Sequence, residues 1–311
     1  MSFDRLIERI IELKNPTVVG LDPKLEYVPE YIQRRYLDDD GWTLKAAAKA
    51  IFAFNQMIID EIHDIVPAIK PQAAYYEMYG HYGIKAMERT IRYAKLNGMF
   101  VITDGKRNDI GATMEAYTNA HLGSVTIGDD NDVEPFGADA LTVNGYLGTD
   151  GISPLLKVCR ERDKGIYVLV KTSNPSSGEL QDKKINGVPV YEQMAKMCTI
   201  WGKELAGKYG YCGVGIVAGA TYPEQGKALR KIMPKSFILV PGYGAQGGKG
   251  ADLVHFFNKD GLGAIINSSR GIIAAYRQEA YAEYGEENYA DAARAAVLAM
   301  KKDIEGSGCL G

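Results

Sequence analysis

FVITDGK (100–106) is an apolar, β-branched run that changes to charged residues at its carboxyl end. Nearly all-apolar runs of this length are typical of strands buried on both faces of a parallel sheet. Helical periodicity fills the segments between such runs, so repeated strand–helix units are predicted. The seven other runs are TVVGLD (17–22), AIKPQ (68–72), ALTVN (140–144), YVLVKT (167–172), VGIVAGA (214–220), FILVPGYG (237–244) and AIINSSR (264–270).

Eight such units predict an α/β fold in which the strands close into a (β/α)8 TIM barrel. Six runs end in charged or polar residues, which would all meet at one face of a barrel but lie along a line in a doubly wound sheet. The amphipathic pattern of residues 1–14 predicts an extra N-terminal helix. Residues 1–311 are therefore expected to form a single barrel domain with long βα loops.

The composition excludes several classes of protein. The net charge of the 311 residues is −3 without a basic stripe, which argues against nucleic-acid binding. No apolar stretch reaches the roughly 18 residues of a membrane span. The four cysteines lack CxxC spacing and the four histidines lack zinc-site spacing, so we expect no metal. Without a secretion signal, a cytoplasmic protein is expected.

The segment TDGKRNDIGATMEAY (103–117) carries the densest chemistry. Asp104 and Lys106 are two residues apart on a predicted strand and therefore point to the same side. Asp109 follows in the next loop, and Lys70 ends the neighbouring strand. Buried charges are costly unless they are paired, so alternating Lys and Asp favours a matched cluster. With Asp22 at another strand end, this cluster is interpreted as a functional site rather than an ion-pair network that only closes the barrel.

PGYGAQGGKG (241–250) follows the seventh predicted strand, and Arg270 ends the eighth. Loops after these two strands commonly hold a phosphate in TIM barrels. Glycines such as Gly244 let backbone N–H groups approach an anion, Gln246 can cap it, and Arg270 offers a bidentate fork. The loop also satisfies G-x-G-x-x-G, but it follows six earlier strands and lacks a downstream acid, which argues against a dinucleotide-binding site.

Two features stay open at this point. Residues 173–189 are polar and rich in Gly and Pro, so they form either a lid over the site or a surface excursion. Lys171 ends a strand, so it is either a Schiff-base lysine or, as we favour, part of a structural ion pair.

Several motifs together resemble the orotidine 5′-phosphate decarboxylase family, in its larger, bacterial-type branch. They are Asp104-Gly-Lys106-Arg107-Asn108-Asp109-Ile110 with Lys70 upstream, GLDP (20–23), KTSNPSSGELQD (171–182), PGYGAQGG (241–248) and NSSRGI (267–272). The D-x-K-x-x-D core alone is shared with hexulose-phosphate synthases and keto-gulonate-phosphate decarboxylases, whereas the whole set is more specific.

The resemblance implies loss of CO2 from orotidine 5′-monophosphate (OMP), giving UMP, without cofactor or metal. Fixed charges would stabilise the carbanion at C6 of the pyrimidine. Lys106 would deliver the proton to C6, and Asp104 would lie near the departing carboxylate. Lys70 would bridge Asp104 and the ribose, and Asp22 would accept a hydrogen bond from the ribose.

The resemblance also implies a homodimer with shared active sites, in which Asp109 and Thr113 reach the neighbouring site. Ser173 would bind the pyrimidine. Ser269 stands where many family members have Gly before the phosphate-binding Arg270. Two other functions remain: a metal-assisted sugar-phosphate aldolase or decarboxylase of the related group, and a nucleotide-binding barrel without catalysis.

Overall fold

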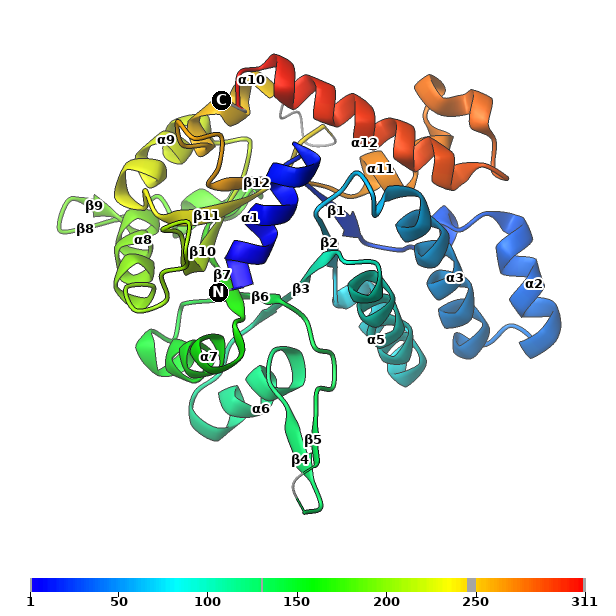
Figure 1. Cartoon of the computed structure of the whole chain (residues 1–311), viewed down its shortest axis with the longest axis horizontal. Coiled ribbons are helices and arrows are strands. Elements are labelled where there is room, and N and C mark those ends of the chain that lie inside the picture. Colours follow the sequence, from blue (N-terminus) through cyan, green and yellow to red (C-terminus); the bar gives the residue numbers. More distant parts are fainter. Residues whose placement is uncertain (1, 130, 245–249, 310–311) are drawn as a thin grey trace.

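A closed ring of eight parallel strands forms the centre of the molecule (Figure 1). The structure is a computed structural model that describes residues 2–129, 131–244 and 250–309. Around the ring the order is β1-β12-β11-β10-β7-β6-β3-β2, so the predicted TIM barrel is confirmed. The strands are β1 (Thr17–Leu21), β2 (Ala68–Pro71), β3 (Phe100–Arg107), β6 (Ala140–Val143), β7 (Gly165–Lys171), β10 (Cys212–Ala218), β11 (Ser236–Pro241) and β12 (Ala264–Ser268).

Helices surround this ring and cover the outer faces of its strands (Figure 1). None of the described helices is long and apolar enough to cross a membrane. The α-helices are α1 (Ser2–Leu13), α2 (Glu30–Asp40), α3 (Leu44–Ile62), α4 (Ala74–Glu77), α5 (Gly80–Leu96), α6 (Gly111–His121), α7 (Thr149–Arg162), α8 (Val190–Trp201), α9 (Pro223–Ile232), α10 (Gly250–Leu253), α11 (Arg270–Ile273) and α12 (Tyr289–Gly306). The 3-10 helices are η1 (Leu25–Tyr27), η2 (Pro175–Glu179), η3 (Val254–Phe256), η4 (Ala275–Arg277) and η5 (Glu279–Tyr284).

The N-terminal helix α1 closes one end of the barrel. Its apolar face, which includes Phe3, Leu6 and Ile7, is buried against side chains from inside the ring. The Phe3 ring lies 5.0 Å from the Tyr167 ring and 5.8 Å from the Phe237 ring, between centroids. Aromatic contacts of this kind add to the hydrophobic gain of burial. Because α1 covers the amino ends of the strands, the cavity of the barrel lies at the carboxyl ends.

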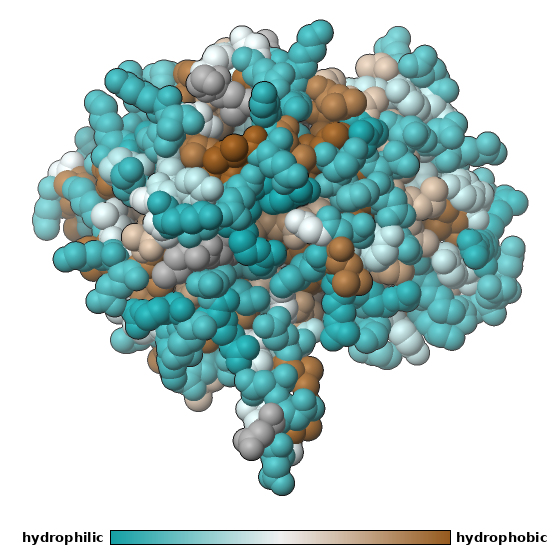
Figure 2. Space-filling view, in the orientation of Figure 1, coloured by the Kyte–Doolittle hydropathy of each residue, from teal (hydrophilic) through white to brown (hydrophobic). Residues whose placement is uncertain are grey.

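An antiparallel hairpin, β4 (Val125–Ile127) and β5 (Asn131–Val133), projects from the barrel between α6 and β6 (Figure 1). Figure 2 shows hydrophobic residues along this projection, where Val125 and Ile127 are 45% and 59% exposed. Arg162 of α7 anchors it, because its Nη2 lies 2.8 Å from Asp132 Oδ2.

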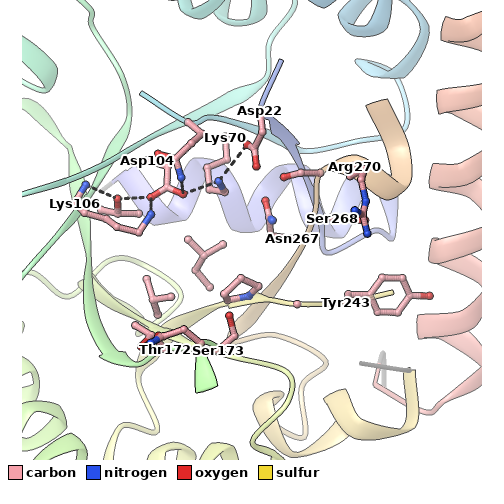
Figure 3. Close-up of a pocket in the computed structure, with 18 of the residues that line it drawn as sticks. Asp22, Lys70, Asp104, Lys106, Thr172, Ser173, Tyr243, Asn267, Ser268 and Arg270 are labelled. Atoms are coloured by element: carbon pink, nitrogen blue, oxygen red, sulfur yellow. Dashed lines mark hydrogen bonds and ion pairs between the residues drawn. The ribbon is translucent and has the colours of Figure 1, made fainter. Parts of the chain in front are cut away.

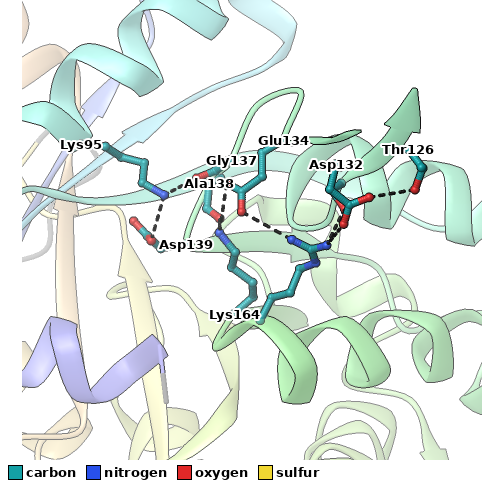
Figure 4. Close-up of polar contacts among 10 residues, drawn as sticks. Lys95, Thr126, Asp132, Glu134, Gly137, Ala138, Asp139 and Lys164 are labelled. Carbon is teal, nitrogen blue, oxygen red and sulfur yellow. Dashed lines mark hydrogen bonds and ion pairs between the residues drawn. The ribbon is translucent and has the colours of Figure 1, made fainter. Parts of the chain in front are cut away.

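Further contacts continue from the hairpin toward the barrel (Figure 4). Lys164 Nζ donates to the Ala138 carbonyl at 2.9 Å, and Lys95 Nζ lies 3.4 Å from Asp139 Oδ1. The connection between β3 and β6 therefore contains two short strands that are tied to the barrel.

Candidate active site

A cavity of about 820 Å³ opens at the carboxyl ends of the strands. Leu169, Val217 and Leu239 give it an apolar wall. Polar side chains also line it, from β2, β3 and β12 and from Asp22 just beyond β1 (Figure 3). A largely apolar pocket with a few convergent polar groups is typical of a small-molecule site. Its position matches the face where TIM barrels carry their active sites.

Four charged side chains predicted from sequence meet in this cavity (Figure 3). Lys70 Nζ lies 2.7 Å from Asp104 Oδ2, and Lys106 Nζ lies 2.6 Å from Asp104 Oδ1. Asp22 Oδ1 lies 3.9 Å from Lys70 Nζ and accepts no hydrogen bond from a described residue. The array therefore alternates in sign, with Asp104 between the two ammonium groups.

The charges of the array support one another although Lys70 and Asp104 are buried. Burial alone would raise the pKa of Asp104, but Lys70 and Lys106 outweigh that effect and hold the pKa well below its ordinary value. Burial would likewise lower the pKa of Lys70, yet Asp104 and Asp22 raise it above its ordinary value. Both groups are therefore ionised at neutral pH.

Asp104 has two further donors that the sequence did not reveal. Gln72 Nε2 donates to Asp104 Oδ2 at 2.9 Å, and Thr142 Oγ1 donates to Oδ1 at 2.7 Å. Thr142 Oγ1 also accepts the backbone N–H of Lys106 at 3.0 Å. The carboxylate thus receives four donors, two on each oxygen. The signal for Gln72 and Thr142 was only their position at the ends of predicted strands.

Lys106 reaches Asp104 from an irregular part of β3. The register between β3 and β6 shifts between Thr103 and Arg107, and Lys106 has φ +47°. A positive φ is strained for a residue with a side chain and occurs where the surrounding structure holds it. The prediction that Asp104 and Lys106 meet is confirmed. Both side chains point into the cavity, as the predicted alternation requires, although the strand is irregular between them.

Arg270 and part of the glycine-rich loop form the other end of the cavity. The Arg270 guanidinium makes no hydrogen bond or ion pair with a described residue. Gly242 (φ +100°) lines the cavity, whereas Gly244 (φ +69°) lines a neighbouring hollow that Arg270 also borders. Asn267, which sequence reasoning missed, also lines the cavity, and its buried Oδ1 accepts no hydrogen bond from the described residues. Gln246 lies outside the described residues.

Ser269 is accommodated by a glycine on the neighbouring strand. A Cβ at Gly20 would lie 1.8 Å from Ser269 Oγ, so only glycine leaves room for this side chain. Ser269 therefore borders the cavity but packs against β1.

The remaining predicted residues divide into two groups. Ser173 lines the cavity together with Thr172, beyond the end of β7. Asp109 and Thr113 do not line it, and Thr113 is exposed on α6. Lys171 does not line it either; its Nζ lies 2.9 Å from Asp182 Oδ1, which supports the structural ion pair over a Schiff-base lysine.

No group of three or more His, Cys, Asp or Glu side chains in the described ranges could hold a metal ion.

Comparison with known proteins supports the resemblance seen in the sequence. A protein of Rhodopirellula baltica named orotidine 5′-phosphate decarboxylase is 43% identical over 301 residues, which are 96% of each chain. A protein of Caldicellulosiruptor saccharolyticus with the same name is 40% identical over 286 residues, covering 92% of this chain and 93% of that one. The solved structure of Leishmania donovani OMP decarboxylase superposes with a TM-score of 0.73 at 28% identity, covering 98% of both chains. Residues 19–284 also match the orotidine 5′-phosphate decarboxylase / HUMPS family, and the chain belongs to that family.

Proposed function

We propose that this chain decarboxylates OMP to UMP and CO2, in the biosynthesis of pyrimidine nucleotides. The observation that carries the proposal is the alternating array Asp22–Lys70–Asp104–Lys106 at the mouth of a TIM barrel. Such an array supplies fixed charge where a carbanion develops, so the stabilisation needs no electron sink. The named relatives that match nearly the whole chain support the same reaction.

The substrate fits the cavity in one orientation. Arg270 and the backbone around Gly242 and Gly244 would bind the 5′-phosphate, because a guanidinium fork and exposed N–H groups match its oxygens. Asp22 and Lys70 would bind the ribose hydroxyls. Asn267 Oδ1, which also lacks a donor among the described residues, would accept a hydrogen bond from the same sugar. The pyrimidine would then lie along the apolar wall, with Ser173 at its polar edge.

The chemical step follows from this placement. The C6 carboxylate would lie beside Asp104, with the Lys106 ammonium next to C6. When the bond between C6 and the carboxylate breaks, its electron pair stays on C6 and CO2 departs. Lys106 donates a proton to C6 and later regains one from water. Asp104 cannot move away from the leaving carboxylate without losing its four donors.

The test is an absorbance assay of OMP conversion with EDTA present. We expect steady turnover of OMP, unchanged by the chelator. Hexulose 6-phosphate and keto-gulonate 6-phosphate with Mg²⁺ serve as alternative substrates. Turnover of a sugar phosphate that EDTA abolishes, with none of OMP, would assign the chain to the metal-assisted branch of the family. Binding of UMP without any turnover would leave only a nucleotide-binding role.

We further infer a homodimer in which each chain completes the site of the other. Asp109 and Thr113 lie outside the cavity of their own chain, although they follow the strand that carries Asp104 and Lys106. Exposed apolar residues gather after β3 and β6, which are neighbours in the ring, and such a patch favours burial against a second copy. They are Ile110 (53% exposed), Tyr117 (37%), Tyr146 (76%) and Leu147 (46%).

Mixed dimers test the shared site. Lys106→Ala and Asp109→Ala are each expected to be inactive alone. Co-expression at equal amounts should restore about a quarter of wild-type activity, because half of the dimers then contain one complete site. If no ratio of the two variants restores activity, Asp109 does not act across an interface.

We also treat residues 1–311 as one catalytic domain of a cytoplasmic protein. Helix α1 closes the barrel and α12 packs on α3 and β1, so segments near both ends of the chain belong to the same core. A single cooperative unfolding transition is expected, and fractionation of cells should recover the protein with the cytoplasm.

A further inference from the structure

Lys171 is a fully buried cation outside the cavity. Its side chain is 0% exposed, yet the proposed reaction does not use it. An ammonium group without water is costly unless other groups replace its hydration. The groups that contact Lys171 therefore indicate the structural role of this buried cation.

A bulge at the end of β7 turns Lys171 away from the cavity. Val217 of β10 pairs with Leu169, and the next residue, Ala218, pairs with Lys171, so two residues of β7 face one of β10. Leu169 and Val217 line the cavity. Without the bulge, Lys171 would point to the same side as Leu169. With it, the side chain points into the segment that follows the strand.

Three groups surround the Lys171 ammonium there. Both Asp182 carboxylate oxygens lie 2.9 Å from Nζ, and Ser177 Oγ accepts a hydrogen bond at 3.0 Å. The Tyr222 ring lies 4.2 Å from Nζ, within the range of a cation–π interaction. Asp182 is 44% exposed, so the pair joins a buried cation to an anion at the surface.

The pair closes the ends of the segment 172–182. Thr172 N–H donates to Gln181 Oε1 at 2.9 Å, and Gln181 Nε2 donates back to Thr172 Oγ1 at 2.8 Å. Lys171 directly precedes Thr172 in the chain, and Asp182 directly follows Gln181. Thr172, Ser173 and Gln181 line the cavity, so the contacts of Lys171 lie directly behind this wall.

We infer that Lys171 is a positioning residue whose ion pair with Asp182 holds segment 172–182 in place as the wall of the cavity. The inference rests on the proposed function only where it places Ser173 of this segment at the polar edge of the pyrimidine. Lys171 thus acts on substrate binding through Thr172, Ser173 and Gln181, without touching the substrate.

The kinetic test compares Lys171→Met with Lys184→Met, the same change at an exposed lysine two residues beyond Asp182. We expect KM for OMP to rise on the order of ten- to a hundredfold in Lys171→Met, because the wall is displaced, with kcat changed far less. Lys184→Met should match the wild type. A kcat that falls as much as kcat/KM, with KM unchanged, would overturn the inference and place Lys171 in the transition state.

Hydrogen exchange tests whether segment 172–182 is held in place, and it needs no enzymatic reaction. The Thr172 amide should be protected in the wild type and should exchange much faster in Lys171→Met, but not in Lys184→Met. Unchanged protection of Thr172 would overturn the inference. This measurement is valid even if the protein does not decarboxylate OMP. Failure of the inference about Lys171 can therefore be distinguished from failure of the proposed function.

A stability cycle separates the ion pair from simple packing. Asp182→Leu leaves a buried ammonium without its anion, so it should lower the urea midpoint more than Lys171→Met does. The double variant should return to the midpoint of Lys171→Met. Additive losses would contradict the ion pair. If Lys171→Met does not fold, Ser177→Ala tests the same contacts, with an expected rise of several-fold in KM; an unchanged KM would count against the inference.

Discussion

Thr142 links the Asp104 carboxylate to the backbone of Lys106, so its hydroxyl should matter far more than its size. It donates to Asp104 Oδ1 at 2.7 Å and accepts the Lys106 N–H at 3.0 Å. Thr142→Val keeps the shape and removes both bonds. Thr103, one residue before Asp104, gives a matched control, because its buried hydroxyl has no hydrogen-bond partner among the described residues.

The size of the effect follows from these contacts. A hydrogen bond to a charged group contributes about 1.5–3 kcal/mol, and a buried N–H left without an acceptor costs about 1–3 kcal/mol. Asp104 keeps three other donors and the Lys106 N–H is only partly buried, so we take the lower end of both ranges and expect a loss of about 3 kcal/mol in the free energy of unfolding. At about 2–3 °C per kcal/mol for a chain of this size, Tm should fall by roughly 6–9 °C.

Catalysis should weaken as well, because the Asp104 carboxylate and the Lys106 backbone lose the hydroxyl to which both are hydrogen-bonded. We expect kcat to fall on the order of ten- to a hundredfold in Thr142→Val, and Thr142→Ser to recover most of it. Thr103→Val should be neutral or slightly stabilising, since it removes an unpaired buried hydroxyl. Thermal unfolding and OMP kinetics measure both effects. Equal losses in the two valine variants, or unchanged kinetics in Thr142→Val, would refute the reasoning.

Two further changes test the phosphate end and a buried histidine. Arg270→Ala should raise KM for OMP on the order of ten- to a hundredfold by removing charge-assisted bonds to the phosphate. The KM for orotidine, which lacks the phosphate, should not change. An equal rise in the KM for orotidine would show that Arg270 does not bind the phosphate. Burial lowers the pKa of His121 to about 4, with a smaller effect from Arg107. The unfolded chain then binds the proton first as pH falls from about 6.5 to 4, so the wild type should lose about 2 kcal/mol of stability between pH 7 and pH 5 from this residue. His121→Leu should lack this loss in urea unfolding, and the same pH dependence in both proteins would refute the assignment.

The sequence predicts the barrel closely because each strand carries its own signal. All eight apolar runs coincide with barrel strands to within three residues. The meeting of Lys70, Asp104 and Lys106 followed from the rule that carboxyl ends of barrel strands share one face. The extra helix at the N-terminus was likewise visible in its apolar stripe.

Details that depend on pairing between distant strands could not be predicted. The bulge that turns Lys171 outward arises where β7 meets β10, and the irregularity at Lys106 where β3 meets β6. Alternation along a single strand contains no information on either. The packing of Ser269 against Gly20 likewise joins residues from opposite ends of the chain. Position near a strand end did not single out Gln72 and Thr142, because polar residues there have many roles.

The most direct test of the account is the fate of C6 when OMP turns over in D2O with EDTA present. The wild type should release UMP that carries one deuterium at C6, delivered by the exchanged Lys106 ammonium. Lys106→Ala should stay folded, bind UMP and lose turnover on the order of a thousandfold or more. Comparable turnover by the two proteins, or a wild type that stops in EDTA, would contradict catalysis by these fixed charges.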